Sequence, residues 1–225
     1  MKSKKGFGSR PKGGCSPDQV FISAGEASGD LHGSMFMREL RALVPGIGFV
    51  GMGGAAMEAM GLKKLVDMKH VSVVGITEVL GRLMGILRAQ RILKAVLINT
   101  RPRLMVLIDF PDFHMSLLGL KEKIGCRILY LIPPQVWAWR AGRIKRLKRY
   151  VDSLAVILPF EEEYYRSRGL KAEYIGNPLV ELYPEPFLGK RDGRIVGILP
   201  GSRVHEVKRN LPVIYEALLL VKERL

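Results

Sequence analysis

The sequence predicts an α/β protein built around a doubly wound parallel sheet. After about residue 20, short apolar runs alternate with longer segments that have helical spacing. The runs are apolar throughout instead of alternating with polar residues, which is typical of parallel strands buried on both faces. Glycine-rich and acidic turns follow several of the runs, at the sheet edge where open α/β folds bind ligands. Together these observations favour a domain with a binding site at the carboxyl ends of its strands.

Five apolar runs are the expected strands, in the order VFISA (20–24), IGFVGM (47–52), LMVLID (104–109), RILYLI (127–132) and SLAVIL (153–158). Each expected helix follows from periodicity between these runs. The helices should cover residues 25–43, a short stretch after 54, then 75–97, 115–123, a basic stretch at 141–149, and a segment from 161.

Residues 177–192 contain three prolines and no clear periodicity, so we expect a linker at 179–193. After it, RIVGILPGSR (194–203) has the pattern of a strand and turn, and 204–225 that of one amphipathic helix. A single strand and helix cannot cover their own apolar faces. We therefore expect a disordered basic tail at 1–18, a complete domain at 19–178, and an unfinished second domain, cut short or completed by another chain.

Composition excludes general disorder, because 48% of the 225 residues are hydrophobic and the mean hydropathy is +0.11. The net charge of +15 indicates an anionic partner: nucleic acid, phosphate or an acidic membrane surface. The two cysteines, Cys15 and Cys126, exclude a disulfide framework and favour a reducing, cytosolic compartment. The longest apolar region, 71–87, contains charged residues and is too short to span a bilayer, so we expect a soluble or peripheral protein.

The first strand ends in AGEASGDLHG (24–33), a glycine-rich turn that opens a helix. Such a turn can present backbone N–H groups to an anion. The equally weighted alternative is a tight turn whose helix is capped by Ser28 or Asp30. The candidate ligand contacts are Gly25, Glu26, Ser28, Gly29, Asp30 and His32. For the second glycine-rich loop, 51–54, we favour a packed turn over ligand contact.

The run at 104–109 leads into IDFPDFH, which places two carboxylates three residues apart at the same edge. A carboxylate here can act as a general base on a hydroxyl group. We interpret Asp109 in this way, with bonding to loop amides as the alternative. Asp112 is a candidate substrate contact, although capping of the next helix is the role we favour for it. His114 has the position of a surface or capping histidine.

An aromatic loop, PPQVWAWR (133–140), carries both tryptophans of the chain. Exposed aromatic side chains beside basic residues favour a binding surface, with Trp137 and Arg140 as candidate contacts. Six basic residues then occur within ten positions: Arg140, Arg143, Lys145, Arg146, Lys148 and Arg149. They indicate a face for phosphates or anionic lipid, with a simply solvated helix face as the alternative.

Apolar residues recur at helical spacing within 71–87, with basic residues nearby. Packing on the sheet is the usual role of such a stripe. The other interpretation is an interfacial helix that enters a bilayer, with its basic residues at the head groups. Its membrane contacts would be Val73, Val74, Ile76, Val79, Leu80 and Leu83.

Eight motifs in one order resemble the lipid-A-disaccharide synthases: AGEASGDLHG, FVGMGG, VVGITEVLGRL, IDFPDFH, PPQVWAWR, LPFEEEYY, YIGNPLVE and ILPGSRVHEV. No single motif would identify the family, but their order is highly specific. The resemblance covers nearly all of the chain after residue 20 and implies a glycosyltransferase of the GT-B type, with two Rossmann-like domains. The second domain would be incomplete here.

The resemblance implies transfer from UDP-2,3-diacylglucosamine to 2,3-diacylglucosamine 1-phosphate, with a β(1→6) bond formed and UDP released. Asp109 would be the base, and the turn of the second domain would contribute Gly201, Ser202, Arg203 and Glu206 to substrate binding. No metal and no other cofactor is implied. An anionic membrane surface would then account for the charge without nucleic acid, placing the protein on the cytoplasmic face of the inner membrane of a Gram-negative bacterium.

Two other functions stay open at this point. A sugar-nucleotide epimerase of similar form would need no acceptor, and a basic nucleic-acid-binding module would show salt-dependent binding to a duplex. An unfinished second domain also favours pairing, as a homodimer or with a complementary C-terminal chain.

Overall fold

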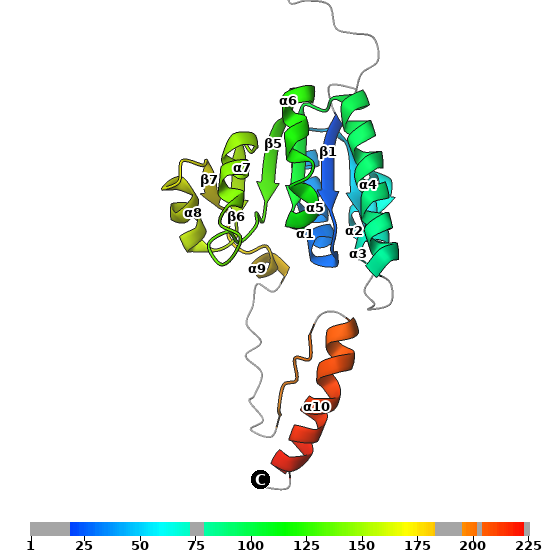
Figure 1. Ribbon diagram of the computed structural model, residues 1–225, viewed down its shortest axis with the longest axis vertical. Coiled ribbons are helices and arrows are strands. Elements are labelled where there is room, and N and C mark those ends of the chain that lie inside the picture. Colours follow the sequence, from blue (N-terminus) through cyan, green and yellow to red (C-terminus); the bar gives the residue numbers. More distant parts are fainter. Residues whose placement is uncertain (1–18, 73–78, 183–194, 202–203, 223–225) are drawn as a thin grey trace, which may run out of the picture.

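The computed structural model describes residues 19–72, 79–182, 195–201 and 204–222 (Figure 1). Seven parallel strands form one sheet in the order β3-β2-β1-β4-β5-β6-β7. Their bounds are β1 Gln19–Ala24, β2 Gly48–Gly53, β3 Leu62–Asp67, β4 Leu104–Ile108, β5 Arg127–Leu131, β6 Ser153–Val156 and β7 Ala172–Tyr174. The order reverses direction between β1 and β4, as in a doubly wound fold. The expected fold class is confirmed.

All five strands expected within residues 19–178 are present, and the two strands that the sequence did not indicate are the outermost ones. β3 carries two lysines and an aspartate in six residues, and β7 has only three residues. Edge strands are often short and charged, because such features prevent pairing with other chains. Their lack of a continuous apolar run explains why the hydrophobic pattern missed them.

Helices cover both faces of the sheet. α1 (Ala27–Leu43) and α2 (Ala55–Ala59) pack on one face; α4 (Val79–Thr100), α6 (Lys121–Ile124), α7 (Arg143–Tyr150) and α8 (Pro159–Arg166) pack on the other. Neighbouring strand residues alternate between two cores, so Phe21 and Met105 face α4 whereas Ile22 and Val106 face α1. This double coverage accounts for the continuous apolar runs.

The prediction of a single helix at 115–123 is wrong. The chain instead forms α5 (Pro111–His114), a turn, the 3₁₀ helix η2 (Leu118–Leu120) and then α6. Adjacent Leu117 and Leu118 are both fully buried. A regular helix would direct them about 100° apart, so breaking the helix allows both to enter the core. α4 runs to Thr100, three residues further than expected, while its expected start at 75 lies outside the described residues.

The strand expected at 194–203 is also not observed, since the described residues 195–201 have no regular secondary structure. No described strand lies beside this segment to complete a ladder, and Leu199 is 90% exposed. The helix that follows, α10 (Val204–Lys222), agrees with the expectation as far as it is described. A short helix, α9 (Leu179–Leu182), lies within the expected linker, and α3 (Lys69–Ser72) precedes α4. None of the described helices is both long and apolar enough to cross a membrane.

Candidate functional site

A cavity of about 550 Å³ lies at the carboxyl ends of β4 and β5. Its walls come from the turn after β1, from α4, and from the loops that follow β4 and β5. The lining residues are Glu26, Ile86, Asp109, Phe110, Pro111, Asp112, Phe113, Ile132, Pro133, Pro134, Gln135 and Trp139. Of the residues singled out in the sequence, Glu26, Asp109 and Asp112 meet here. Their acidic side chains share the cavity with an apolar and aromatic wall.

The backbone of Asp109 is fixed from three directions. Its N–H donates to the Leu131 carbonyl at 3.0 Å. Its carbonyl accepts from Nδ1 of His114 at 2.7 Å and from the Tyr130 hydroxyl at 3.0 Å. Asp109 also adopts a left-handed backbone conformation (φ 46°), as does Phe110 (φ 48°). Aspartate tolerates this conformation better than most residues. Because β5 supplies both Leu131 and Tyr130, this strand helps to fix the Asp109 backbone and with it the place of the carboxylate on the cavity wall.

His114 is fully buried beneath this turn, so the expectation of a surface or capping histidine is wrong. Its Nδ1 donates to a carbonyl, which can only accept, so Nε2 accepts from the Ser23 hydroxyl at 2.9 Å. Burial lowers the pKa of His114 to about 4, and the imidazole is neutral at pH 7. His114 thereby connects the end of β1 with the end of β4. The sequence offered one signal, namely that Ser23 and Tyr130 are polar residues inside the apolar parts of their strands.

The glycine-rich turn after β1 packs against the same structure. A Cβ at Gly25 would lie only 2.2 Å from the ring of Phe110, so the close approach of the two turns requires glycine here. Glu26 is the N-cap of α1, and within the described part of the chain no side chain makes a capping hydrogen bond there. Capping by Ser28 or Asp30 is therefore wrong. Ser28 is exposed in the first turn of α1, two positions after Glu26, which lines the cavity.

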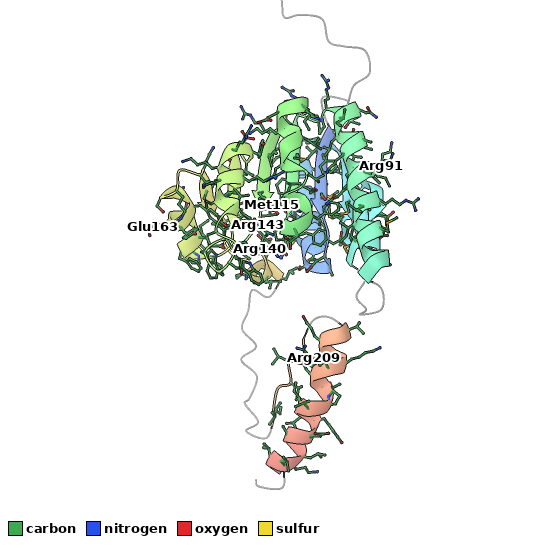
Figure 2. The ribbon with its side chains drawn as sticks, viewed as in Figure 1. Arg91, Met115, Arg140, Arg143, Glu163 and Arg209 are labelled. Carbon is green, nitrogen blue, oxygen red and sulfur yellow. The ribbon has the colours of Figure 1, made fainter. Side chains whose placement is uncertain are left out.

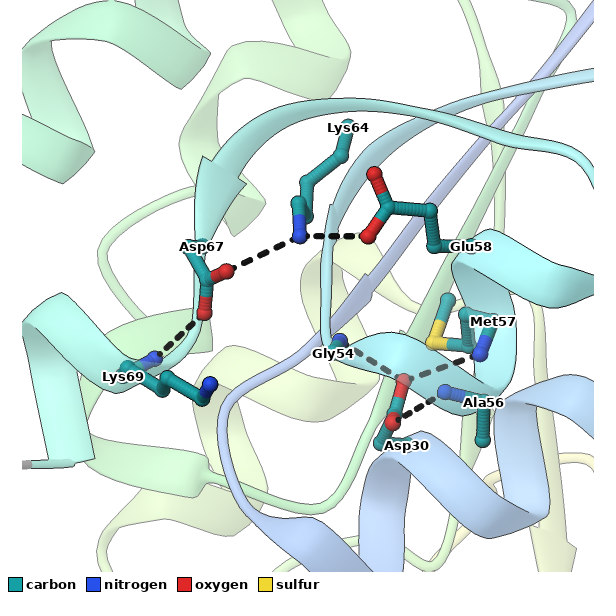
Figure 3. A network of polar contacts seen from close by, with 8 residues as sticks. All are labelled: Asp30, Gly54, Ala56, Met57, Glu58, Lys64, Asp67 and Lys69. Carbon is teal, nitrogen blue, oxygen red and sulfur yellow. Dashed lines mark hydrogen bonds and ion pairs between the residues drawn. The ribbon is translucent and has the colours of Figure 1, made fainter.

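Asp30 is buried and holds the second glycine-rich segment (Figure 3). Its Oδ1 accepts from the N–H groups of Gly54 at 2.7 Å and Met57 at 3.1 Å, and its Oδ2 accepts from Ala56 at 2.9 Å. These amides lie at the start of α2, where helix N–H groups lack partners within the helix. Residues 51–53 belong to β2, not to a turn, which agrees with packing in preference to ligand contact. Asp30 thus serves the packing of α1 on α2.

His32 is also buried, and its Nδ1 has no hydrogen-bond partner among the described residues. Burial lowers the pKa of His32, so this side chain is neutral at pH 7 as well. It does not line the cavity. Among the described residues, no three His, Cys, Asp or Glu side chains gather as metal ligands would.

The aromatic loop is attached to α8. Nε1 of Trp137 donates to the buried carboxylate of Glu161 at 2.9 Å, and the Tyr165 hydroxyl donates to the Pro134 carbonyl. Trp137 also meets the ring of Phe160 edge-on, at 5.0 Å between centroids. Trp139, which was not among the contacts expected from the sequence, lines the cavity instead and is 69% exposed. The loop therefore uses one tryptophan as an anchor and presents the other.

Asp112 does not cap α5, because Phe110 is its N-cap and no side chain bonds there. Asp112 instead pairs with the guanidinium groups of Arg140 and Arg143. Further along α7, Arg149 pairs with Glu122 at 2.7 Å and lies over the ring of Tyr150. The basic run, which has no acid within it, thus obtains acidic partners from other parts of the chain.

Several expected contacts lie outside the described residues, namely Ser202 and Arg203 of the C-terminal turn and Val73, Val74 and Ile76 before α4. Val79, Leu80 and Leu83 belong to α4, but their side chains are not described. Gly201 has φ +126°, and Glu206 lies so close that a Cβ at Gly201 would meet it. Gly201 therefore lies close to Glu206, which belongs to the first turn of α10.

Comparison with known proteins identifies the family to which the chain belongs. A family model described as lipid-A-disaccharide synthetase matches residues 20–225. The lipid-A-disaccharide synthase of Geobacter metallireducens is 40% identical over 94% of this chain and 58% of the relative. That of Myxococcus xanthus is 41% identical over 89% of this chain and 55% of the relative. The chain thus spans little more than half the length of these relatives.

The fold has a counterpart among solved structures, the Glycyrrhiza uralensis protein UGT73P12 in complex with glycyrrhetinic acid 3-O-monoglucuronide. The TM-score is 0.50, with 72% of this chain and 49% of the other covered. At 9% identity, this likeness concerns the fold alone. The family is established by the sequence match over most of the chain, and the protein belongs to the lipid-A-disaccharide synthetase family.

Proposed function

We propose that this chain supplies the acceptor-binding half of a lipid A disaccharide synthase. The complete enzyme would join UDP-2,3-diacylglucosamine to 2,3-diacylglucosamine 1-phosphate, giving a β(1→6) disaccharide 1-phosphate and UDP. One observation carries this proposal, the position of Asp109 on the cavity wall at the carboxyl end of β4. The family and the names of its relatives support the reaction.

In this reaction Asp109 acts as the general base. Its carboxylate takes the proton from the acceptor 6-hydroxyl while that oxygen attacks C1 of the donor sugar. The bond from C1 to the UDP oxygen breaks, and UDP leaves with the bonding electrons, so the configuration at C1 inverts. Fixing the Asp109 backbone supports this role, because general-base catalysis depends on a carboxylate held within hydrogen-bond distance of the hydroxyl.

Substrate contacts follow from the cavity and from the sequence motifs. Glu26, with Gly25, Ser28 and Gly29 in the same turn, would meet the acceptor sugar beside Asp109. The apolar wall and the exposed Trp139 suit its acyl groups. In the second domain we propose donor contacts at Gly201, Ser202, Arg203 and Glu206.

We also propose that the protein works at an anionic membrane surface on the cytoplasmic side. α4 supports this placement, because its exposed residues include Met84 and Leu87 together with the basic Arg88 and Arg91. Figure 2 shows Arg91 on this helix. Ile86 of the same helix lines the cavity, so the helix reaches from the surface to the site. An apolar helix with basic neighbours is suited to the interface of an anionic bilayer.

The test is direct. The purified chain is incubated with both acylated substrates, and the disaccharide is sought by mass spectrometry. A full-length family member carrying the Asp109→Asn substitution at this position should lose at least about 100-fold in turnover, because a general base contributes ~10²–10⁴-fold. Near-normal turnover of that variant with an intact fold would exclude Asp109 as the base. Product formed without acceptor would indicate an epimerase instead.

A further inference from the structure

Two arginines converge on a single carboxylate oxygen at the edge of the cavity. Nη1 of Arg140 and Nη2 of Arg143 both donate to Oδ1 of Asp112. The arginines come from the end of the aromatic loop and from the first residue of α7, and Figure 2 shows them near each other. The cluster carries two positive charges and one negative charge. It therefore has a surplus positive charge.

The exposure of the three side chains indicates that an anion from solution can reach this cluster. Asp112 is 73% exposed and Arg140 is 60% exposed, whereas Arg143 is only 16% exposed. The Arg143 side chain is therefore held in place by its surroundings, whereas Arg140 and Asp112 can exchange partners in water. Exposed ion pairs contribute little to stability, so the Asp112 contacts are easily displaced.

The arginines also lie in a position that favours a stronger anion. Arg143 is the first residue of α7, and no acidic residue occurs in the first turn of this helix. A cation is least favourable at this end of a helix, where the backbone dipole is positive. A phosphomonoester carries up to two negative charges and three acceptor oxygens, which can satisfy both guanidinium groups at once. A single shared carboxylate oxygen cannot.

We propose that Arg140 and Arg143 form a subsite for a phosphomonoester group and that Asp112 occupies this subsite until the phosphate displaces it. Asp112 lines the same cavity as Asp109, so the phosphate would sit at the mouth of the cavity. Assigning this phosphate to the sugar 1-phosphate acceptor rests on the proposed function. The same chemistry is offered by the head group of phosphatidic acid, and the test separates the two sources.

The experiment measures binding of α-D-glucosamine 1-phosphate to the purified chain by calorimetry at low ionic strength. Asp112→Asn removes the internal competitor and should tighten binding about three- to tenfold, since it removes contacts of up to about 1 kcal/mol together with a repulsive charge. Arg140→Gln and Arg143→Gln should each weaken binding at least about tenfold. Unfolding curves show whether each variant is folded, and the Asp112→Asn gain tests the proposal even if Arg143→Gln does not fold.

Arg149→Gln is the matched control. It lies on the same helix, makes the same change in charge, and pairs with Glu122 instead of Asp112. It should change affinity less than about twofold. An equal loss for Arg149→Gln and Arg143→Gln would show general attraction to a basic surface and would overturn the subsite. Unchanged or weaker binding by Asp112→Asn would overturn it as well.

Three comparisons identify the source of the phosphate. Glucosamine without phosphate should not bind, and inorganic phosphate should compete with the sugar phosphate. Retention on phosphatidic acid vesicles that depends on Arg143, combined with no binding of the sugar phosphate, would overturn the acceptor assignment.

The binding test is independent of the transfer reaction. Normal binding at the arginines without any disaccharide product would contradict the proposed function and leave the subsite standing. If the chain forms disaccharide product but Arg140→Gln and Arg143→Gln still bind glucosamine 1-phosphate normally, the subsite alone is contradicted.

Discussion

Asp30 and Asp109 lie at the same edge of one sheet, yet the fold uses opposite parts of the two residues. The Asp30 carboxylate is buried and accepts three backbone N–H groups at the start of α2. At Asp109 the backbone carbonyl accepts the structural hydrogen bonds, from His114 and Tyr130, while the side chain lines the cavity. An acidic residue at the ligand-binding edge is therefore not enough to indicate chemistry. What matters is whether the main chain or the side chain anchors it.

The same isosteric substitution at both residues tests this difference most strongly. Asp30→Asn should lower the free energy of unfolding by about 4 kcal/mol, because an amide NH₂ would face a buried N–H and the charge-assisted bonds would weaken. Asp109→Asn should lower it by less, about 1 kcal/mol, since the three backbone hydrogen bonds of Asp109 remain and asparagine tolerates a left-handed conformation. Urea denaturation at pH 7 measures both values.

The two variants act as controls for each other, because both remove one negative charge. Similar losses of stability would show that the Asp109 side chain is also structural. A stable Asp30→Asn variant would show that the amides of α2 find other partners.

Stability should also fall in acid, through the histidine that anchors Asp109. Burial lowers the pKa of His114 from 6.5 to about 4, so the unfolded chain binds a proton in this range that the folded chain does not. The stabilisation is present in full above pH 6.5 and is lost as the pH falls towards 4. The loss is about 3 kcal/mol, at 1.36 kcal/mol per pKa unit. Urea denaturation across pH 4–7 measures it.

His32, on the Asp30 side of the sheet edge, gives the matched comparison. Its pKa is lowered too, by burial, but His32 is 8% exposed whereas His114 is completely buried, so His32 is desolvated less. His114→Asn should remove most of the acid sensitivity between pH 4 and 6.5, and His32→Asn should remove less. The reverse order would contradict the assignment of the acid response to the Asp109 anchor.

The sequence predicted the strands at the centre of the sheet and the sheet edge at which the candidate cavity lies, but not the contacts that build this cavity. The central strands were visible because both of their faces are buried, and the edge where they end was visible from turns such as 109–114. The role of His114 depends on Ser23, which lies 91 residues earlier, and on a carbonyl exposed by a left-handed turn. Local patterns contain neither fact. For the same reason, the sequence could not show that the Asp30 carboxylate accepts backbone N–H groups whereas that of Asp109 lines the cavity.

The segments that begin with β1 and with residue 195 illustrate the same limit. Both have a strand-like run, a glycine-containing turn and a helix. Residues 19–24 form a strand because β2 and β4 pair with it on either side, and Ile22 is completely buried. Residues 195–201 have the pattern without such neighbours among the described residues, and they form no strand. Hydrophobic pattern indicates the capacity to form a strand, and partners complete it.

The smallest effect that we predict concerns the second donor to the Asp109 carbonyl. Tyr130→Phe removes the hydroxyl that donates to this carbonyl at 3.0 Å. The hydroxyl is an effective donor at neutral pH because burial holds the pKa of Tyr130 well above its usual range. The carbonyl keeps its bond from His114, so no buried polar group is left without a partner, and the cost should be about 1 kcal/mol.

Tyr165→Phe is a suitable control for this variant, because the Pro134 carbonyl that it leaves also accepts from the Val136 N–H at 2.7 Å. Both variants should unfold at similar urea concentrations. Only Tyr130→Phe should speed the hydrogen exchange of the Asp109 amide, which bonds to Leu131 of the next strand. Equal exchange in the two variants would show that His114 alone holds the turn. Asp109 would then depend on a single histidine, while Asp30 shares its role among three amides, and the two sides of the sheet edge would differ even more.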